Sequence, residues 1–90
     1  MITRKEIFET LVEMIADCVV ELKVFPSEIT ESMRLKNDLG ADSMDIAELA
    51  EKCERRYRIA IKDPELERAE TVGELTNLIA EKLNNIGYGR

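Results

Sequence analysis

The chain has 90 residues, of which 44% are hydrophobic, and its 19 acidic and 13 basic side chains give a formal net charge of −6. This length supports one hydrophobic core, so we expect a single domain over residues 1–90. The acidic balance argues against a protein that binds nucleic-acid phosphates, and the absence of histidine excludes Ser-His and Cys-His catalytic pairs.

The first predicted element is a helix over residues 4–22. Thr3 and Glu6 have the spacing of a capping box, in which each side chain accepts a hydrogen bond from the other residue's backbone N–H. Apolar residues then recur at helical spacing and predict the buried face of this helix: Ile7, Leu11, Met14, Ile15, Cys18 and Leu22.

A long connection over residues 23–42 follows. Four apolar residues are predicted to anchor it in the core: Ile29, Met33, Leu35 and Leu39. Connections longer than about 12–15 residues without regular structure are uncommon and often functional. We therefore expect functional residues where this connection ends.

The second helix is predicted to begin at Ser43, with Asp42 as its cap, and to end near Tyr57. Its inner stripe consists of Ile46, Leu49, Ala50, Cys53 and Tyr57. Cys18 and Cys53 both fall on apolar helical stripes. We interpret them as reduced, buried thiols rather than as a disulfide.

An extended join over residues 59–61 leads to a short third helix, which Asp63 caps, Pro64 opens and Ala69 ends. Thr71 and Glu74 form a second capping box at the start of a last helix. The predicted face of that helix consists of Val72, Leu75, Ile79, Lys82 and Leu83. Residues 84–90 are predicted to fray. The fold class is therefore all-α: a small bundle of three longer helices and one short helix, with a long loop between the first two.

Residues 38–49, DLGADSMDIAEL, resemble the attachment motif of the acyl carrier protein family. Further matches to that family's pattern follow without a gap: Tyr57, Ile61, Asp63, Thr71 and Val72. The resemblance implies that a separate transferase joins a 4'-phosphopantetheine arm from coenzyme A to Ser43. Acyl groups would then be held as thioesters on the thiol of that arm.

The residue types around Ser43 suit this role. The start of a helix offers unpaired backbone amides and the positive end of the helix dipole, which favour a phosphate. Gly40 permits a tight turn, and Asp42 can cap the helix while Ser43 stays exposed. A chain without histidine has no such base to activate the serine, so the thiol of the arm is the expected nucleophile and the chain itself is not expected to be an enzyme.

The resemblance also implies that the outer face of the second helix contacts basic patches on partner enzymes. The predicted contacts are Asp38, Met44, Asp45, Ala47, Glu48 and Glu51. The end of this helix departs from the family pattern, because basic residues stand where fatty-acid carriers are typically acidic: Lys52, Arg55, Arg56 and Arg58. Electrostatic steering is therefore expected to concentrate at the start of the helix.

Three small residues, Ala47, Ala50 and Ala60, could leave room for an acyl chain between the helices or could simply let the helices pack closely. A peptidyl carrier resembles this chain less, because that group usually has a second glycine or a different residue where Ala41 stands.

We expect a monomeric carrier for fatty-acid, polyketide or related acyl synthesis. We expect it in the cytoplasm, since residues 1–10 lack the plan of a signal peptide. Its expected partners are a phosphopantetheinyl transferase and acyl-transferring, condensing or acyl-activating enzymes. No nucleic acid, membrane insertion or metal site is expected. The alternative is a carrier-like structural subunit that docks a partner through its second helix without needing the arm. Replacement of Ser43 by alanine separates the two, because only the carrier loses its function.

Overall fold

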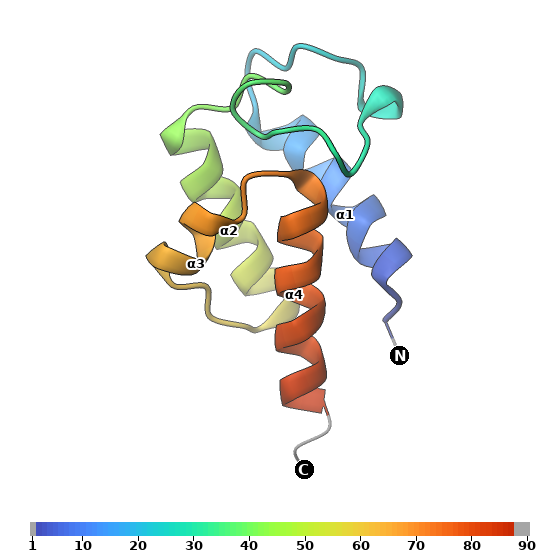
Figure 1. Cartoon of the computed structure of the whole chain (residues 1–90), viewed down its shortest axis with the longest axis vertical. Coiled ribbons are helices and arrows are strands. Elements are labelled where there is room, and N and C mark those ends of the chain that lie inside the picture. The colour runs from blue at the N-terminus through green and yellow to red at the C-terminus, as the bar shows by residue number, and fades with distance from the viewer. Residues whose placement is uncertain (1, 88–90) are drawn as a thin grey trace.

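The structure, a computed structural model, describes residues 2–87 and the side chains of residues 2–84. Its elements are α1 (Arg4–Cys18), the 3-10 turn η1 (Pro26–Glu28), α2 (Ser43–Tyr57), α3 (Asp63–Arg68) and α4 (Val72–Gly87) (Figure 1). The described residues form no strand, although one isolated antiparallel bridge joins Arg34 to Thr71. The predicted all-α bundle with a long loop between its first two helices is confirmed.

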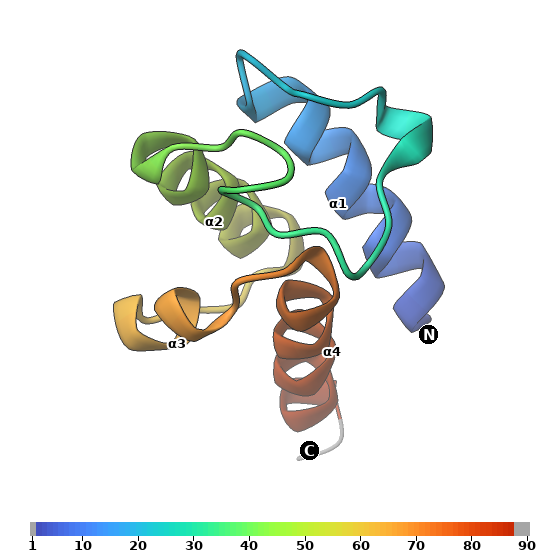
Figure 2. The same ribbon diagram turned by 45° about the horizontal axis from the view of Figure 1, so that its top comes forward.

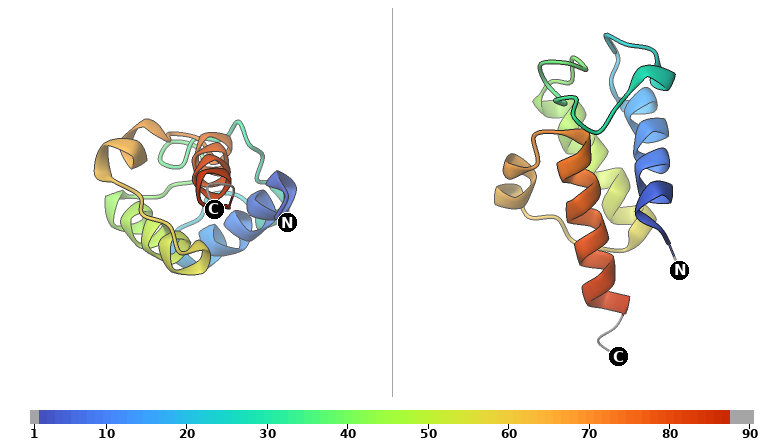
Figure 3. Two further views of the ribbon diagram at one scale, coloured as in Figure 1. Left: turned by 90° about the horizontal axis from the view of Figure 1, so that it is seen from below. Right: turned by 45° about the vertical axis from the view of Figure 1, so that its right-hand side comes forward.

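The core lies between the three longer helices. Helix α1 packs against both α2 and α4, and α3 packs on the side of α4 away from α1 (Figure 3). The largest fully buried side chains come from all three longer helices and from the loop: Ile7, Leu11, Ile15, Leu35, Leu39, Leu49, Cys53, Val72, Leu75, Thr76 and Ile79. The predicted helical stripes are therefore the buried faces, although Met14, Leu22, Ile46 and Leu83 are only partly buried.

Helix α1 ends at Cys18, four residues before the predicted end at residue 22. At Val19 the backbone turns extended, with φ −88° and ψ 105°. The β-branched residue has a low helix propensity, and the chain must turn here so that the Lys23 N–H reaches the Leu39 carbonyl at 3.1 Å. Leu22 thus approaches the core from a loop rather than from the helix.

Side-chain caps start the helices. Thr3 and Glu6 form the predicted capping box of α1, and Thr71 and Glu74 form that of α4, with N–H to oxygen distances of 3.0 and 3.1 Å. Helix α3 begins one residue earlier than predicted, because Asp63 is its first residue rather than its cap. The carboxylate of Glu65 accepts a hydrogen bond from the Lys62 N–H at 2.9 Å and so fixes the earlier start.

The long loop crosses one end of the bundle and is held by backbone hydrogen bonds (Figure 2). The Leu35 N–H donates to the Glu70 carbonyl at 2.9 Å, and the Val72 N–H donates to the Met33 carbonyl at 3.0 Å. Three of the four predicted anchors, Ile29, Leu35 and Leu39, are buried, and Met33 is partly buried. The loop therefore has a defined path, and it places residues 34–37 beside the start of α2.

Arg4 ties this loop to both terminal helices. Its guanidinium forms a two-point ion pair with Glu31, with both nitrogen–oxygen distances at 2.6 Å, and donates to Asn77 Oδ1 at 2.7 Å. Gly73 lies against Glu31, where an added Cβ would be 3.0 Å from the Glu31 carbonyl oxygen. The start of α1, the loop and the start of α4 thus meet at one polar junction.

Helix α4 continues to Gly87, so the backbone of residues 84–87 is helical. Residues 88–90, the rest of the segment predicted to fray, lie outside the described residues. Within the described part of the chain, no helix is both long and apolar enough to cross a membrane.

Candidate functional site

Ser43 is the first residue of α2, and its side chain is exposed. Asp42 precedes it as the predicted cap and accepts a hydrogen bond from the Asp45 N–H at 2.8 Å. The helix itself offers no acceptor to the N–H groups of Ser43 and Met44, because these belong to its first turn. An exposed hydroxyl thus lies beside free amides and the positive end of the helix dipole, which suits a phosphate ester at Ser43.

Gly40 makes the turn that leads into this helix. Its φ is +86°, in the region that residues with a side chain rarely adopt. A Cβ at this position would lie 3.0 Å from the Glu21 carbonyl oxygen and 3.1 Å from Lys23 Cγ. The sequence-based prediction of a tight turn at Gly40 is confirmed, and the close approach of residues 21–23 gives a second reason for glycine.

The structure brings the predicted contact residues together around the start and outer face of α2. Met44 is 81% exposed, and Ala47, Glu48 and Glu51 are also exposed. Their spacing along the helix places them on neighbouring positions of one outward face. This face and Ser43 are therefore accessible to the same partner surface.

Two of the predicted contact acids also hold the local fold. Asp38 accepts a hydrogen bond from the Arg34 N–H at 2.7 Å, and Asp45 accepts one from the Asp42 N–H at 3.1 Å. The Asp38 carboxylate therefore stabilises the turn over residues 34–38, and the Asp45 carboxylate stabilises the first turn of α2, which contains Ser43. Among residues 2–87, no three or more acidic or cysteine side chains gather in a way that could hold a metal ion.

The basic end of α2 is exposed as well. Arg55, Arg56 and Arg58 are open to solvent, and Arg55 lies 3.9 Å from Glu51 in a loose ion pair. Arg58 ends the helix in the left-handed conformation, with φ 56°. The outer face of α2 thus changes from acidic near Ser43 to basic near its end.

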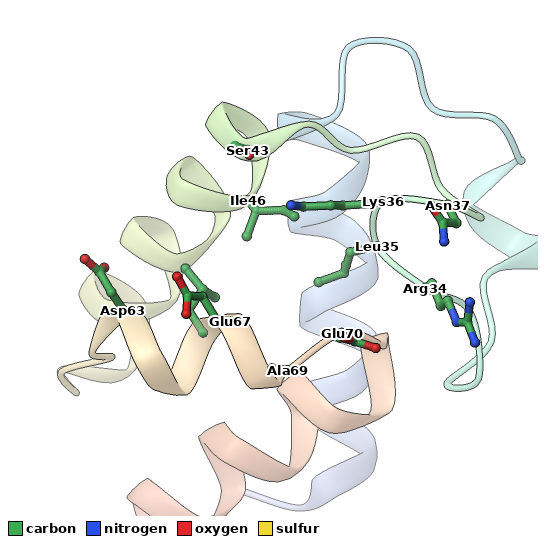
Figure 4. A pocket seen from close by; sticks show the side chains of 11 residues that line it. Arg34, Leu35, Lys36, Asn37, Ser43, Ile46, Asp63, Glu67, Ala69 and Glu70 are labelled. Carbon is green, nitrogen blue, oxygen red and sulfur yellow. The ribbon is translucent and has the colours of Figure 1, made fainter.

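A pocket of about 630 Å³ opens beside Ser43, between α2, residues 34–37 of the loop and α3. Its apolar lining consists of Leu35, Ile46, Leu66 and Ala69. Seven other residues line it with polar or charged groups: Arg34, Lys36, Asn37, Ser43, Asp63, Glu67 and Glu70. Figure 4 shows the Lys36 side chain lying across the opening toward Ile46, with Asp63 and Glu67 rising from α3.

Sequence reasoning missed this pocket. The three alanines considered for it do not line it, since Ala47 and Ala60 are exposed and Ala50 is buried elsewhere in the packing. The pocket is built by segments that only the tertiary fold brings together. The one signal in the sequence was Leu66, a single apolar residue in the charged short helix.

The two cysteines lie inside the core and are free, as predicted. Burial raises the pKa of the Cys53 thiol to about 12, and burial also raises the pKa of Cys18. Cys53 Sγ lies 3.8 Å from Met14 Sδ. Since the thiolate is the reactive form, neither side chain competes as a nucleophile with a thiol on an exposed arm.

Comparison with known proteins identifies the motif around Ser43. Residues 9–79 match the family described as "Phosphopantetheine attachment site". The acyl carrier protein of Thermotoga maritima is 36% identical over 83 residues, which cover 92% of this chain and 99% of that protein.

Solved structures agree with the sequence match. The HMG-ACPI domain of the CurA module from Lyngbya majuscula superposes with a TM-score of 0.77 and 28% identity, over 94% of this chain and 82% of that domain. Hexanoyl ACP from the actinorhodin polyketide synthase of Streptomyces coelicolor superposes with a TM-score of 0.72 and 29% identity, over 83% of this chain and 87% of that protein.

Proposed function

Because the chain belongs to the acyl carrier family of phosphopantetheine-attachment domains, we propose that Ser43 is the residue to which its arm is joined. The chain is a non-catalytic acyl carrier whose phosphopantetheine arm serves fatty-acid or polyketide synthesis. One observation supports Ser43 as the attachment residue more strongly than the other observations do. Its hydroxyl is exposed on the first turn of α2, directly after the Asp42 cap and within the matched residues.

The attachment reaction would need little from the chain itself. The Ser43 Oγ forms a bond to the phosphorus nearest the pantetheine of coenzyme A, the pyrophosphate bond breaks, and adenosine bisphosphate leaves. The hydroxyl proton would go to a base that the transferase supplies. The first-turn amides of α2 then face the new phosphodiester, which carries a negative charge.

The acyl groups would be held on the arm as thioesters while partner enzymes act on them. Tethering raises the concentration of the acyl group at each enzyme that the carrier docks, without any catalysis by the carrier. The proposed docking face consists of Met44, Ala47, Glu48 and Glu51, with Asp38 and Asp45 beside the arm. Its partners are the transferase and acyl-transferring, condensing or acyl-activating enzymes with basic patches.

We further propose that residues 1–90 act as one carrier domain and that it works as a monomer in the cytoplasm. The single core between α1, α2 and α4 supports the first point. The outer face of α2 is exposed and charged, which suits a surface that a partner enzyme occupies only transiently and so supports a monomer.

Attachment is tested by incubating the purified chain with coenzyme A and a broad-specificity phosphopantetheinyl transferase and recording its intact mass. The expected result is a gain of one phosphopantetheine by the native chain and none by the Ser43→Ala variant. Gain by the variant would place the arm elsewhere. If the folded native chain gained no phosphopantetheine from this transferase, nor from one encoded beside its own gene, the structural-subunit alternative would be favoured instead.

A further inference from the structure

A line of outward-facing residues on α2 runs from the proposed docking face to Arg55. Successive residues of an α-helix are rotated by about 100°, so positions separated by four, three and four residues fall on one narrow stripe. The exposed side chains of this stripe are Met44, Glu48, Glu51 and Arg55. No other described element lies over this side of α2 (Figure 3). A partner enzyme that lies along the stripe from Ser43 therefore meets Arg55 as well.

The charge on α2 reverses between its first and its last turn. Residues 42–48 carry three acidic and no basic side chains, whereas residues 51–58 carry four basic and two acidic ones. The chain as a whole has a net charge of −6, so the basic end of α2 is a local departure from the composition. The proposed docking face accounts for the acidic start of this helix but not for its basic end.

The arginines at the end of α2 are available to another molecule. The side chain of Arg55 is 74% exposed, and its one ion pair, which lies within α2, is 3.9 Å long and contributes little. Arg56 and Arg58 are exposed and form no ion pair or side-chain hydrogen bond within the described residues. Glu54 is half-buried and accepts a hydrogen bond from the Ile61 N–H at 2.8 Å. The fold thus engages this acid and leaves the guanidinium groups free.

Of the three arginines, Arg55 is the one in line with the acidic residues. Arg56 is turned by about 100° around the helix, and Arg58 follows the helix end with φ 56°. Arg55 lies about 6 Å beyond Glu51 along the helix axis and about 18 Å beyond Ser43. A standard interface covers about 800 Å² of each partner, a patch roughly 30 Å across, so one enzyme reaches from the arm to Arg55.

The order of charges along the stripe distinguishes between partner surfaces. An uninterrupted basic patch suits Glu48 and Glu51 but meets Arg55 with like charge, which disfavours that partner. A carboxylate placed opposite Arg55 instead accepts two parallel hydrogen bonds from the planar guanidinium. The complementary surface is therefore basic near the arm and acidic about one helical turn further along.

We infer that Arg55 selects partner enzymes that place a carboxylate opposite the end of α2, next to the basic residues that meet Glu48 and Glu51. Enzymes with a basic patch along the whole helix are disfavoured. Arg56 and Arg58 add to this choice through their charge. The inference rests on the proposed function and defines the surface chemistry of the partner in acyl synthesis.

The test uses the condensing enzymes encoded in the genome of the source organism, each purified. The transferase loads the full chain with a pantetheine arm that ends in a chloroacetamide, and the active-site cysteine thiolate of a condensing enzyme displaces the chloride. Intact mass first verifies one arm per chain, and circular dichroism verifies that each variant is folded. The rate of cross-linking at low salt then measures docking. Free chloroacetamide pantetheine gives the rate without docking.

We expect at least one enzyme to react much faster with the loaded chain than with the free arm. For that enzyme, Arg55→Glu should lower the rate at least about tenfold, and Arg55→Gln, which adds no repulsion, about threefold. Arg56→Glu, turned away from the stripe, should lower it less than Arg55→Glu does. Lys5→Glu makes the same charge change on the exposed side of α1 and should keep nearly the native rate.

The enzyme's own carboxylate provides the reciprocal test. Surface acids around the entrance to its active site are replaced by lysine one at a time. One replacement should restore rapid cross-linking to Arg55→Glu while slowing the native chain, because the ion pair is then reversed. The absence of any such replacement would overturn the inference.

The remaining outcomes separate the inference from the proposed function. A folded chain that takes up no arm overturns both. With the arm loaded, the inference alone is overturned if no enzyme reacts faster than with the free arm, if Arg55→Glu reacts as fast as the native chain or faster, or if Lys5→Glu loses as much. Unchanged cross-linking together with Arg55-dependent binding to phosphatidylglycerol vesicles, or with an Arg55-dependent dimer in sedimentation, would assign the basic end to a lipid surface or to a second copy of the chain.

Discussion

Asp42 and Asp45 exchange hydrogen bonds across the first turn of α2. The Asp42 carboxylate accepts from the Asp45 N–H at 2.8 Å, and the Asp45 carboxylate accepts from the Asp42 N–H at 3.1 Å. Ser43 and Met44 lie between them and take no part in the exchange. The two acids therefore fix the start of the helix while leaving the hydroxyl of Ser43 and the side chain of Met44 free for other molecules.

Removal of either acid should therefore weaken the fold as well as any docking. Asp42→Ala and Asp45→Ala are each expected to lower the free energy of unfolding by about 1 kcal/mol, the usual effect of losing a helix cap. Urea denaturation measures it. Asp42→Asn keeps an acceptor and should cost far less. An unchanged stability in Asp45→Ala would show that its carboxylate serves only partner enzymes.

Gly40 should tolerate substitution poorly, for two reasons that a variant pair can separate. Gly40→Ala is expected to lower the free energy of unfolding by about 1–3 kcal/mol, since it meets both the positive φ and the Glu21 carbonyl. Asparagine adopts positive φ more readily. If strain dominates, Gly40→Asn should therefore be less destabilising than Gly40→Ala in thermal unfolding. If the contact with residues 21–23 dominates, the larger asparagine should be at least as destabilising.

The sequence was sufficient to predict the helices and the attachment motif because local rules determine them. The Thr3–Glu6 and Thr71–Glu74 capping boxes and the helical stripes depend on residues a few positions apart. The errors lie where distant segments meet. Helix α1 ends at Cys18 because the Lys23 N–H must reach the Leu39 carbonyl, a contact across 16 residues that no local pattern encodes.

The candidate site divides in the same way. Asp42, Ser43 and the turn at Gly40 belong to one short segment, so their arrangement was predictable from the motif. The pocket was not predictable, because its walls come from the loop, from α2 and from α3. Asp45 was assigned to the docking face, and its second role as a cap became visible only through its hydrogen bond to Asp42.

The buried thiols should leave the thiol of the arm as the reactive one. With a pKa of about 12, the Cys53 thiol is almost wholly protonated near pH 8. We expect iodoacetamide at about pH 8 to alkylate the folded holo chain once, on the thiol of the arm. The folded Ser43→Ala chain, which has no arm, should not be alkylated. In urea both chains should gain two further modifications, at Cys18 and Cys53. Rapid native alkylation of either cysteine would contradict the packing of the core.

Acid should weaken the fold through its paired glutamates. Hydrogen bonds from Arg4 hold the pKa of Glu31 below its ordinary value, and hydrogen bonds from the Lys62 N–H and then Lys82 do the same for Glu65. A lowered folded-state pKa means that the unfolded chain takes up the proton first as the pH falls. The contribution of each carboxylate is therefore present above its unfolded pKa of about 4.3 and is lost below it.

The pH test compares melting temperatures near pH 6 and near pH 3. Glu31→Gln and Glu65→Gln should each melt lower than the native chain near pH 6 and should lose less on acidification. Glu9→Gln is the matched control, because Glu9 is exposed and takes part in no hydrogen bond or ion pair within residues 2–84. If the control flattens the pH profile as much as Glu31→Gln does, general charge repulsion rather than these pairs sets the acid response.

Docking should depend on two acids more than on the others near Ser43. Asp38, Asp42 and Asp45 are engaged with backbone N–H groups, whereas Glu48 accepts no hydrogen bond within the described residues and Glu51 has only a loose contact with Arg55 at 3.9 Å. Reversal of Glu48 and Glu51 therefore changes the docking charge without removing a cap. We expect the Glu48→Lys, Glu51→Lys double variant to lower the kcat/KM of loading by the transferase at least about tenfold at low salt, and less at high salt.

The matched control reverses Glu9 and Glu13, two exposed acids on α1, and so makes the same change in net charge away from Ser43. A local docking face predicts that this control keeps nearly the native loading rate. Equal losses in the two double variants would mean that net charge, rather than the outer face of α2, guides the transferase. Unchanged loading in Glu48→Lys, Glu51→Lys would remove both acids from the docking face and leave Met44 as its principal contact, because the side chain of Met44 is 81% exposed directly beside Ser43.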